Sequence, residues 1–370
     1  MSRVDNRFVG DQLRLARLAK GLSLEEVASA IGATRQFIHQ LENGSRSPGP
    51  EAALALADAL GVAVDFFYTA EAAGVRPEQC HFRKQQTTPA SIISQVLARG
   101  TMVDRLVTAL DTRLRLPAVD FPDIQVVNVE EIERAAETAR AHWGLGAEGP
   151  ITNMIRVVEL AGAVVTNFEG LSERVDALSM DRPRPIIVRN DAKSSLCRQR
   201  FDLAHEAGHL IMHRGIETGD KFTEDQAHRF AGAFLFPRTA FIREFPRSRQ
   251  MNWTALYQLK LRWKVSVRAM VRRAFDLGVI DAAQYRSANI QLVKNGNAKT
   301  EKYDDVLQLE VPELLATALT TLQSTGKEAL NDLCDDLSLS FPMFELLTGH
   351  DLAPRADLPD NVMRFRDYLL

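Results

Sequence analysis

The chain is organised around one stretch, Arg198–Pro237, which reads RQRFDLAHEAGHLIMHRGIETGDKFTEDQAHRFAGAFLFP. Within this stretch, His205, Glu206 and His209 form the pattern H-E-x-x-H. Residues four apart on an α-helix lie one turn apart on the same face, so the two imidazoles can bind one Zn²⁺ ion. The glutamate beside them can then activate water. The pattern therefore indicates a hydrolytic metal site.

A catalytic zinc ion takes three protein ligands, so the motif needs a third ligand from elsewhere. The downstream candidates are His213, Glu217, Asp220, Glu224, Asp225 and His228. Glu224 opens a second amphipathic helix that ends at Pro237, and we expect the first turn of that helix to face the site. An alternative is that the ion only holds two helices together, but structural sites usually complete their ligand set with Cys or His.

Composition sets the broad class of the protein. A length of 370 residues favours about two to three domains, and 45% hydrophobic and 25% charged residues are typical of globular chains. The three cysteines show no C-x-x-C spacing, which argues against a disulfide framework or a thiolate zinc cluster. A polar start and the absence of any apolar run of 18 residues lead us to expect a cytoplasmic protein that does not enter a membrane.

Residues 7–70 show short apolar repeats at helical spacing, which predict a compact all-helical unit. Ser23 and Glu26 form a predicted capping box, Gly32 ends the second helix, and Thr34 can cap the third. Helices of this length joined by such tight turns are typical of a DNA-binding helix-turn-helix.

The segment LSLEEVASAIGATRQFIHQLENGSRSPGPEAALALADALGV resembles the XRE (lambda-repressor-like) helix-turn-helix family. The resemblance implies a five-helix domain that binds a double-stranded DNA operator. It places the residues Arg35, Gln36, His39 and Gln40 at or near the bases, with Arg46 on a phosphate. The alternative is a small helical bundle used for protein contact. Because Lys and Arg are sparse here, we expect the protein to bind DNA as a homodimer.

Residues 71–125 form a predicted helical junction, with an amphipathic helix across Ile92 to Leu110 and a break at 116–122. Residues 126–250 follow with two helices and apolar strands near 163–166, 177–180 and 185–188. Helices, a small sheet and the motif helix together predict an α+β domain, so the chain is mainly α with a small sheet. A sheet edge beside a metal site can pair with an extended peptide.

The motif pair RFDLAHEAGHLIMH and EDQAHRFAGAFLFP resembles the ImmA/IrrE family of zinc metallopeptidases. The upstream segments WGLGAEGPITNMIRVVELAGAVV and VDALSMDRPRPIIV fit the same family. The resemblance implies a zincin-like fold, Glu206 as the catalytic residue, and His205, His209 and Glu224 as metal ligands. The family usually has Asn four residues after that Glu, where this chain has His228. His228 is therefore an alternative ligand or a residue that supports the ligands.

Beyond the motifs, residues 251–290 are strongly basic and resemble a helix-turn-helix-like subdomain of the same family, whereas residues 291–370 are predicted to be helical and carry many acidic residues. The sequence leads us to expect a transcription regulator with zinc-dependent endopeptidase activity, Mn²⁺ being the alternative metal. The expected substrate is a regulatory protein, a repressor, whose cleavage controls stress or mobile-element genes. The alternative is a transcription factor or antitoxin-like regulator whose peptidase-like domain senses a signal or binds a partner without proteolysis.

Overall fold

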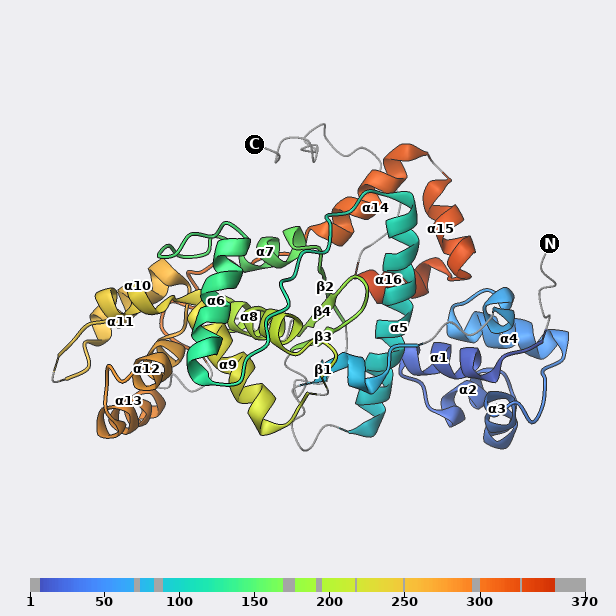
Figure 1. The fold of residues 1–370 in the computed structure, drawn as a ribbon. Helices are drawn as coiled ribbons and strands as arrows, with labels where there is room; N and C mark the ends of the chain where they lie inside the picture. Colours follow the sequence, from blue (N-terminus) through green and yellow to red (C-terminus); the bar gives the residue numbers. More distant parts are fainter. Residues whose placement is uncertain are drawn as a thin grey trace.

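A computed structural model describes residues 7–69, 74–82, 89–168, 177–190, 195–216, 218–248, 250–294, 300–326 and 328–349. Its fold is mainly α with a small four-stranded sheet, as the sequence predicted. The sheet lies between two groups of helices (Figure 1). Each group has its own hydrophobic core.

The N-terminal helices form the smaller unit at one end of the molecule (Figure 1). They are α1 (Gly10–Lys20), α2 (Leu24–Ala30), α3 (Arg35–Glu42), α4 (Pro50–Leu60) and the 3-10 helix η1 (Val64–Tyr68). The predicted caps are present, since Ser23 and Glu26 form the capping box of α2 and the Thr34 hydroxyl accepts a hydrogen bond from the Phe37 N–H at 3.2 Å. Four of the five expected helices are α-helical, and the fifth is the short 3-10 helix.

The long helix α5 (Ala90–Arg113) joins the N-terminal unit to the C-terminal helices. α1 packs against it, and the Arg99 Nε donates to the Ala19 carbonyl at 2.8 Å. The C-terminal helices are α14 (Leu314–Thr325), α15 (Ala329–Leu337) and α16 (Phe341–Thr348), and α15 and α16 contact α5. The Ala63 N–H also donates to the Ser338 carbonyl at 2.8 Å. The N-terminal helices and α14–α16 therefore share one core.

The sheet has the strand order β1-β3-β4-β2. Its strands are β1 (Cys80–Phe82), β2 (Val164–Asn167), β3 (Ala177–Met180) and β4 (Ile186–Arg189). β2 is parallel to β4, whereas β3 is antiparallel to both β4 and β1. Because side chains alternate along a strand, Val164 and Val188 enter the first core while Val165 and Ile187 enter the second. β1, which follows the 3-10 turn η2 (Pro77–Gln79), was not predicted from the sequence.

The second core belongs to the larger helical group. Its helices are α6 (Val129–His142), α7 (Met154–Leu160), α8 (Leu196–Met212), α9 (Lys221–Leu235), α10 (Arg238–Glu244), α11 (Trp253–Trp263), α12 (Val267–Asp276) and α13 (Ala282–Lys294). α6 and α8 both pack against α9. The buried Arg140 of α6 donates to the Phe234 carbonyl at 2.7 Å and so holds the end of α9. None of the described helices combines the length and the apolar composition that a membrane crossing requires.

Candidate functional site

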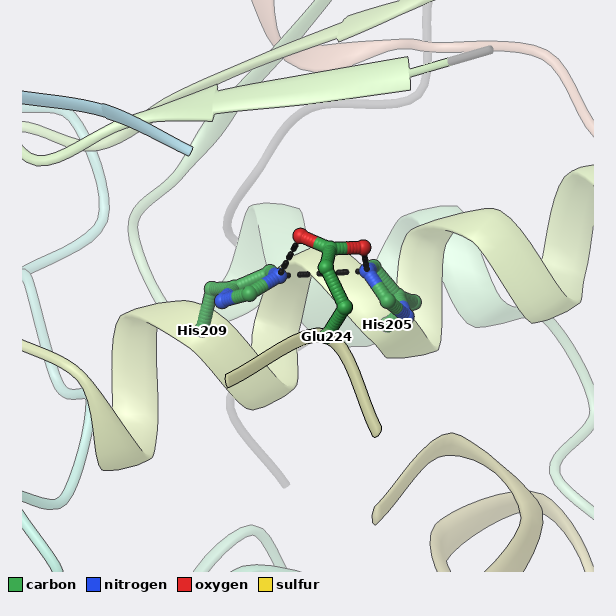
Figure 2. A group of neighbouring side chains, drawn as sticks. All are labelled: His205, His209 and Glu224. Atoms are coloured by element: carbon green, nitrogen blue, oxygen red, sulfur yellow. Dashed lines mark hydrogen bonds and ion pairs between the residues drawn. The ribbon is translucent and has the colours of Figure 1, made fainter. Parts of the chain in front are cut away.

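The H-E-x-x-H motif lies on α8, as predicted, and its polar side chains are buried. His205, Glu206 and His209 are 3%, 2% and 1% exposed. The Nε2 atoms of the two histidines lie 3.1 Å apart and point toward the same space (Figure 2). Two ring nitrogens this close face a common centre, which is the arrangement expected of a pair of metal-ligating histidines.

Glu224 reaches the two histidines from the first turn of α9 (Figure 2). Its Oε2 lies 3.3 Å from the His205 Nε2, and its Oε1 lies 3.4 Å from the His209 Nε2. This approach depends on Gly208, because a Cβ at that position would lie 2.8 Å from the Phe230 ring of α9. The glycine therefore allows α8 and α9 to pack closely enough for the three side chains to meet.

The donor set of this group suits a divalent cation. Ligand atoms of His205, His209 and Glu224 all lie within 4.8 Å of one another, and two imidazole nitrogens with one carboxylate are a common zinc set. The Glu224 Oε1 is buried and finds no hydrogen-bond donor in the described part of the chain. A buried carboxylate oxygen without a donor is costly unless a cation compensates it, so these residues fit a metal ion.

The protonation states of the group also favour metal binding. Burial lowers the pKa of His209 to about 4. Burial alone would raise the pKa of Glu224, but the neighbouring imidazoles of His205 and His209 outweigh it and hold this pKa well below its usual range. At neutral pH, His209 is thus neutral and Glu224 is ionised, and these are the forms that bind metals.

A chain of hydrogen bonds behind His209 fixes its orientation. The Gln226 Oε1 lies 2.8 Å from the His213 Nε2, and the His213 Nδ1 lies 2.9 Å from the His209 Nδ1. An amide oxygen only accepts, so His213 carries its proton on Nε2 and accepts through Nδ1. His209 then donates from Nδ1, which leaves the lone pair of its Nε2 directed at the common centre. His213 and Gln226 therefore support His209 from outside the ligand group.

Glu206 is held by the sheet. The Ser179 hydroxyl of β3 donates to the Glu206 Oε2 at 2.6 Å, and Ser179 is fully buried. The bond fixes the carboxylate of the residue that follows His205 on α8, which is the position of the general base in the H-E-x-x-H pattern. Sequence reasoning did not identify Ser179, because its distance from Glu206 in the chain gives no local signal.

The remaining candidate ligands lie in other positions. The His228 ring packs 4.7 Å from the Phe201 ring and 6.2 Å from the His205 ring, so the structure groups Glu224 rather than His228 with the two histidines. Asp220 caps α9 by accepting from the Phe222 N–H at 2.7 Å, and Asp225 is exposed. Glu217 lies outside the described residues.

His81 of β1 is a site residue whose position the sequence did not reveal. Its ring stacks on the His209 ring with centroids 4.9 Å apart and planes 7° apart. The side chain is 1% exposed, and its Nδ1 lies 2.7 Å from the Thr218 hydroxyl. Burial, followed by the neighbouring His209, lowers the pKa of His81 to about 3, so this ring is neutral at physiological pH.

The second set of predicted site residues lies on and just after α3. Arg35, Gln36, His39 and Arg46 are exposed, and Gln40 is half-buried. The Arg46 guanidinium lies 5.5 Å from the centre of the Phe37 ring. These side chains are therefore available to a partner outside the chain.

Two stretches of the chain match known families. Residues 13–67 match the helix-turn-helix family, and residues 158–275 match the IrrE N-terminal-like domain, a peptidase family. No curated protein matches the chain significantly. The first stretch contains α3, and the second contains both helices of the candidate metal site. The chain therefore joins a helix-turn-helix domain to a domain of the IrrE/ImmA-like peptidase family.

Proposed function

We propose that this protein is a DNA-binding transcription regulator that also hydrolyses peptide bonds in another regulatory protein, a repressor. The observation that supports the peptidase activity best is the meeting of His205, His209 and Glu224 around one centre, with Glu206 next to His205 in the chain and held by Ser179. A site that only senses or stores a metal has no need of a neighbouring general base.

In this proposal His205, His209 and Glu224 hold Zn²⁺, or Mn²⁺ as the alternative. When bound, the ion supplies positive charge that polarises the scissile carbonyl and acidifies water. Glu206 accepts the proton of the attacking water and passes it to the leaving amine. Ser179 keeps the Glu206 carboxylate in place throughout, because its hydroxyl donates to Oε2.

The helix-turn-helix domain supplies the proposed operator binding. Exposed Arg35 and Gln36 at the start of α3 can read base edges, since Arg recognises guanine and Gln recognises adenine. Arg46 follows the helix and suits a phosphate contact. Glu42 of α3 pairs with Arg17 at 2.6 Å within the domain, which removes one cation from its surface. Residues 7–69 contain six Lys and Arg residues against seven Asp and Glu residues, and this lack of net positive charge favours binding as a homodimer.

The test compares the wild-type protein with Glu206→Gln after loading with Zn²⁺. Each is incubated with purified repressors encoded near its gene, and metal content is measured by mass spectrometry. We expect both to bind one equivalent of zinc and Glu206→Gln to cleave about 10²–10⁴ times more slowly, because only the proton acceptor is lost. Glu137→Gln, at an exposed position of α6, is the matched control.

Two outcomes distinguish a peptidase from a regulator that works without proteolysis. Cleavage by Glu206→Gln at the wild-type rate would overturn the assigned role of Glu206. A wild-type protein that binds zinc and operator DNA but cleaves none of the repressors would support a regulator that works without proteolysis.

A further inference from the structure

Strand β1 comes from the segment between the helix-turn-helix domain and α5, yet it lies in the sheet of the peptidase-like domain (Figure 1). It pairs antiparallel with β3 in the register Cys80 with Met180, His81 with Ser179 and Phe82 with Leu178. The Asp181 N–H donates to the Gln79 carbonyl at 2.8 Å and extends the pairing by one residue. The outer edge of β3 is thus covered by a strand from elsewhere in the chain.

This covered edge is the one beside the candidate site. β3 contacts α8, and its Ser179 bonds to Glu206. The β1 residue opposite Ser179 is His81, whose ring stacks on His209. An extended peptide that adds to a sheet edge gains main-chain hydrogen bonds and presents its bonds at a fixed register. A peptide seated on β3 would therefore pass the site at the position that β1 now holds.

β1 is held in place by the kinds of contact that hold a bound peptide. His81 fills a fully buried place over His209 and bonds to Thr218 in the loop between α8 and α9. The neighbouring Cys80 is buried in the core that contains α5. The Arg182 Nη1 donates to the Gln79 Oε1 at 3.1 Å. Backbone pairing and a single buried side chain over the site are what a bound peptide would also provide.

We propose that the outer edge of β3 is the docking edge for the extended segment of a protein substrate, and that β1 occupies this edge as a built-in ligand that the substrate must displace. The proposal rests on the peptidase function proposed above. An occupied edge lowers the apparent affinity for a peptide in proportion to the fraction of molecules in which the edge is open.

The test measures binding of two hydroxamates to the zinc-loaded full chain by calorimetry. Acetohydroxamate reaches only the metal, whereas tetra-alanyl hydroxamate also needs the strand edge. Met180→Cys places a thiol directly opposite Cys80 in the antiparallel pair, so that oxidation to a disulfide locks β1 onto β3 and reduction frees it. His81→Ala loosens β1 instead, and His142→Ala, at an exposed histidine of α6, is its control.

We expect His81→Ala to bind tetra-alanyl hydroxamate about tenfold or more tightly than wild type, and oxidised Met180→Cys to bind it at least about tenfold more weakly than the reduced form. Acetohydroxamate should bind the oxidised and reduced forms of Met180→Cys alike. Equal binding of tetra-alanyl hydroxamate by the oxidised and reduced forms would overturn the docking edge alone. Failure of every form to bind zinc and acetohydroxamate would overturn the proposed peptidase site and this inference with it.

Discussion

Helices α8 and α3 carry the two sets of candidate functional residues, and they differ most in burial. Fourteen of the seventeen residues of α8 are buried, against two of eight in α3. The polar groups of the H-E-x-x-H motif on α8 therefore contact β1, β3 and α9, whereas Arg35, Gln36 and His39 of α3 face solvent. Burial lets neighbouring elements set protonation and geometry, as hydrolytic chemistry requires, and exposure leaves side chains ready for an outside partner.

The largest loss of Zn²⁺ affinity should come from removing Glu224, the proposed ligand on α9. Glu224→Ala should lower the affinity for Zn²⁺ by more than about 100-fold, because it removes a direct donor rather than a supporting one. Competition with a chromogenic chelator measures this affinity. Asp225→Ala, at the adjacent exposed carboxylate, is the control and should bind as wild type does. An equal loss in His228→Ala would show that His228, and not Glu224 alone, holds the metal.

A smaller effect should follow from breaking the hydrogen-bond chain behind His209. Gln226→Leu removes the acceptor for His213 and should weaken Zn²⁺ binding by about 10–100-fold, the usual cost of losing such support. Gln226→Glu keeps an acceptor at the same place and should retain most of the affinity. If both variants lose Zn²⁺ affinity equally, the hydrogen bonds from Gln226 through His213 do not fix the tautomer of His209. The burial of α8 would then matter less for the state of its ligands than the comparison with α3 suggests.

The smallest change in binding should come from Arg46, which lies in the exposed region after α3, and it should concern DNA rather than Zn²⁺. Arg46→Ala should weaken binding to all DNA sequences by a similar factor and reduce the slope of the salt dependence by about one. Fluorescence anisotropy at several salt concentrations measures both quantities. Zinc affinity should stay at the wild-type value, as it should in the control Arg134→Ala on α6. Sequence-selective loss in Arg46→Ala would mean that this side chain reads a base.

Local patterns in the sequence were enough to place most elements. The capping box at Ser23 and the cap at Thr34 identified the helix starts around α3, and both caps form as expected. The apolar runs near 163–166, 177–180 and 185–188 identified β2, β3 and β4 to within one residue. These signals depend on neighbours in the chain, and helix periodicity and capping are local by nature.

The missed features share one physical cause. β1 is three residues long, and its place in the sheet is specified by pairing with a strand about one hundred residues away. His81 and Ser179 likewise acquire their roles only when β1, β3 and α8 meet. A three-residue segment is too short to show a periodicity that predicts its partners. The contacts of β1, His81 and Ser179 could therefore not be predicted from the sequence alone.

The sequence is enough to predict that two histidines share one face of α8, that a glutamate follows the first of them, and that a helix begins after Thr34, because helical geometry and capping fix these relations locally. Three features depend on the folded chain: Glu224 rather than His228 lies against the two histidines, Gln226 and His213 orient His209, and β1 covers the edge of β3. Each of these outcomes depends on how separate elements pack, and Gly208 shows that one missing side chain can permit that packing.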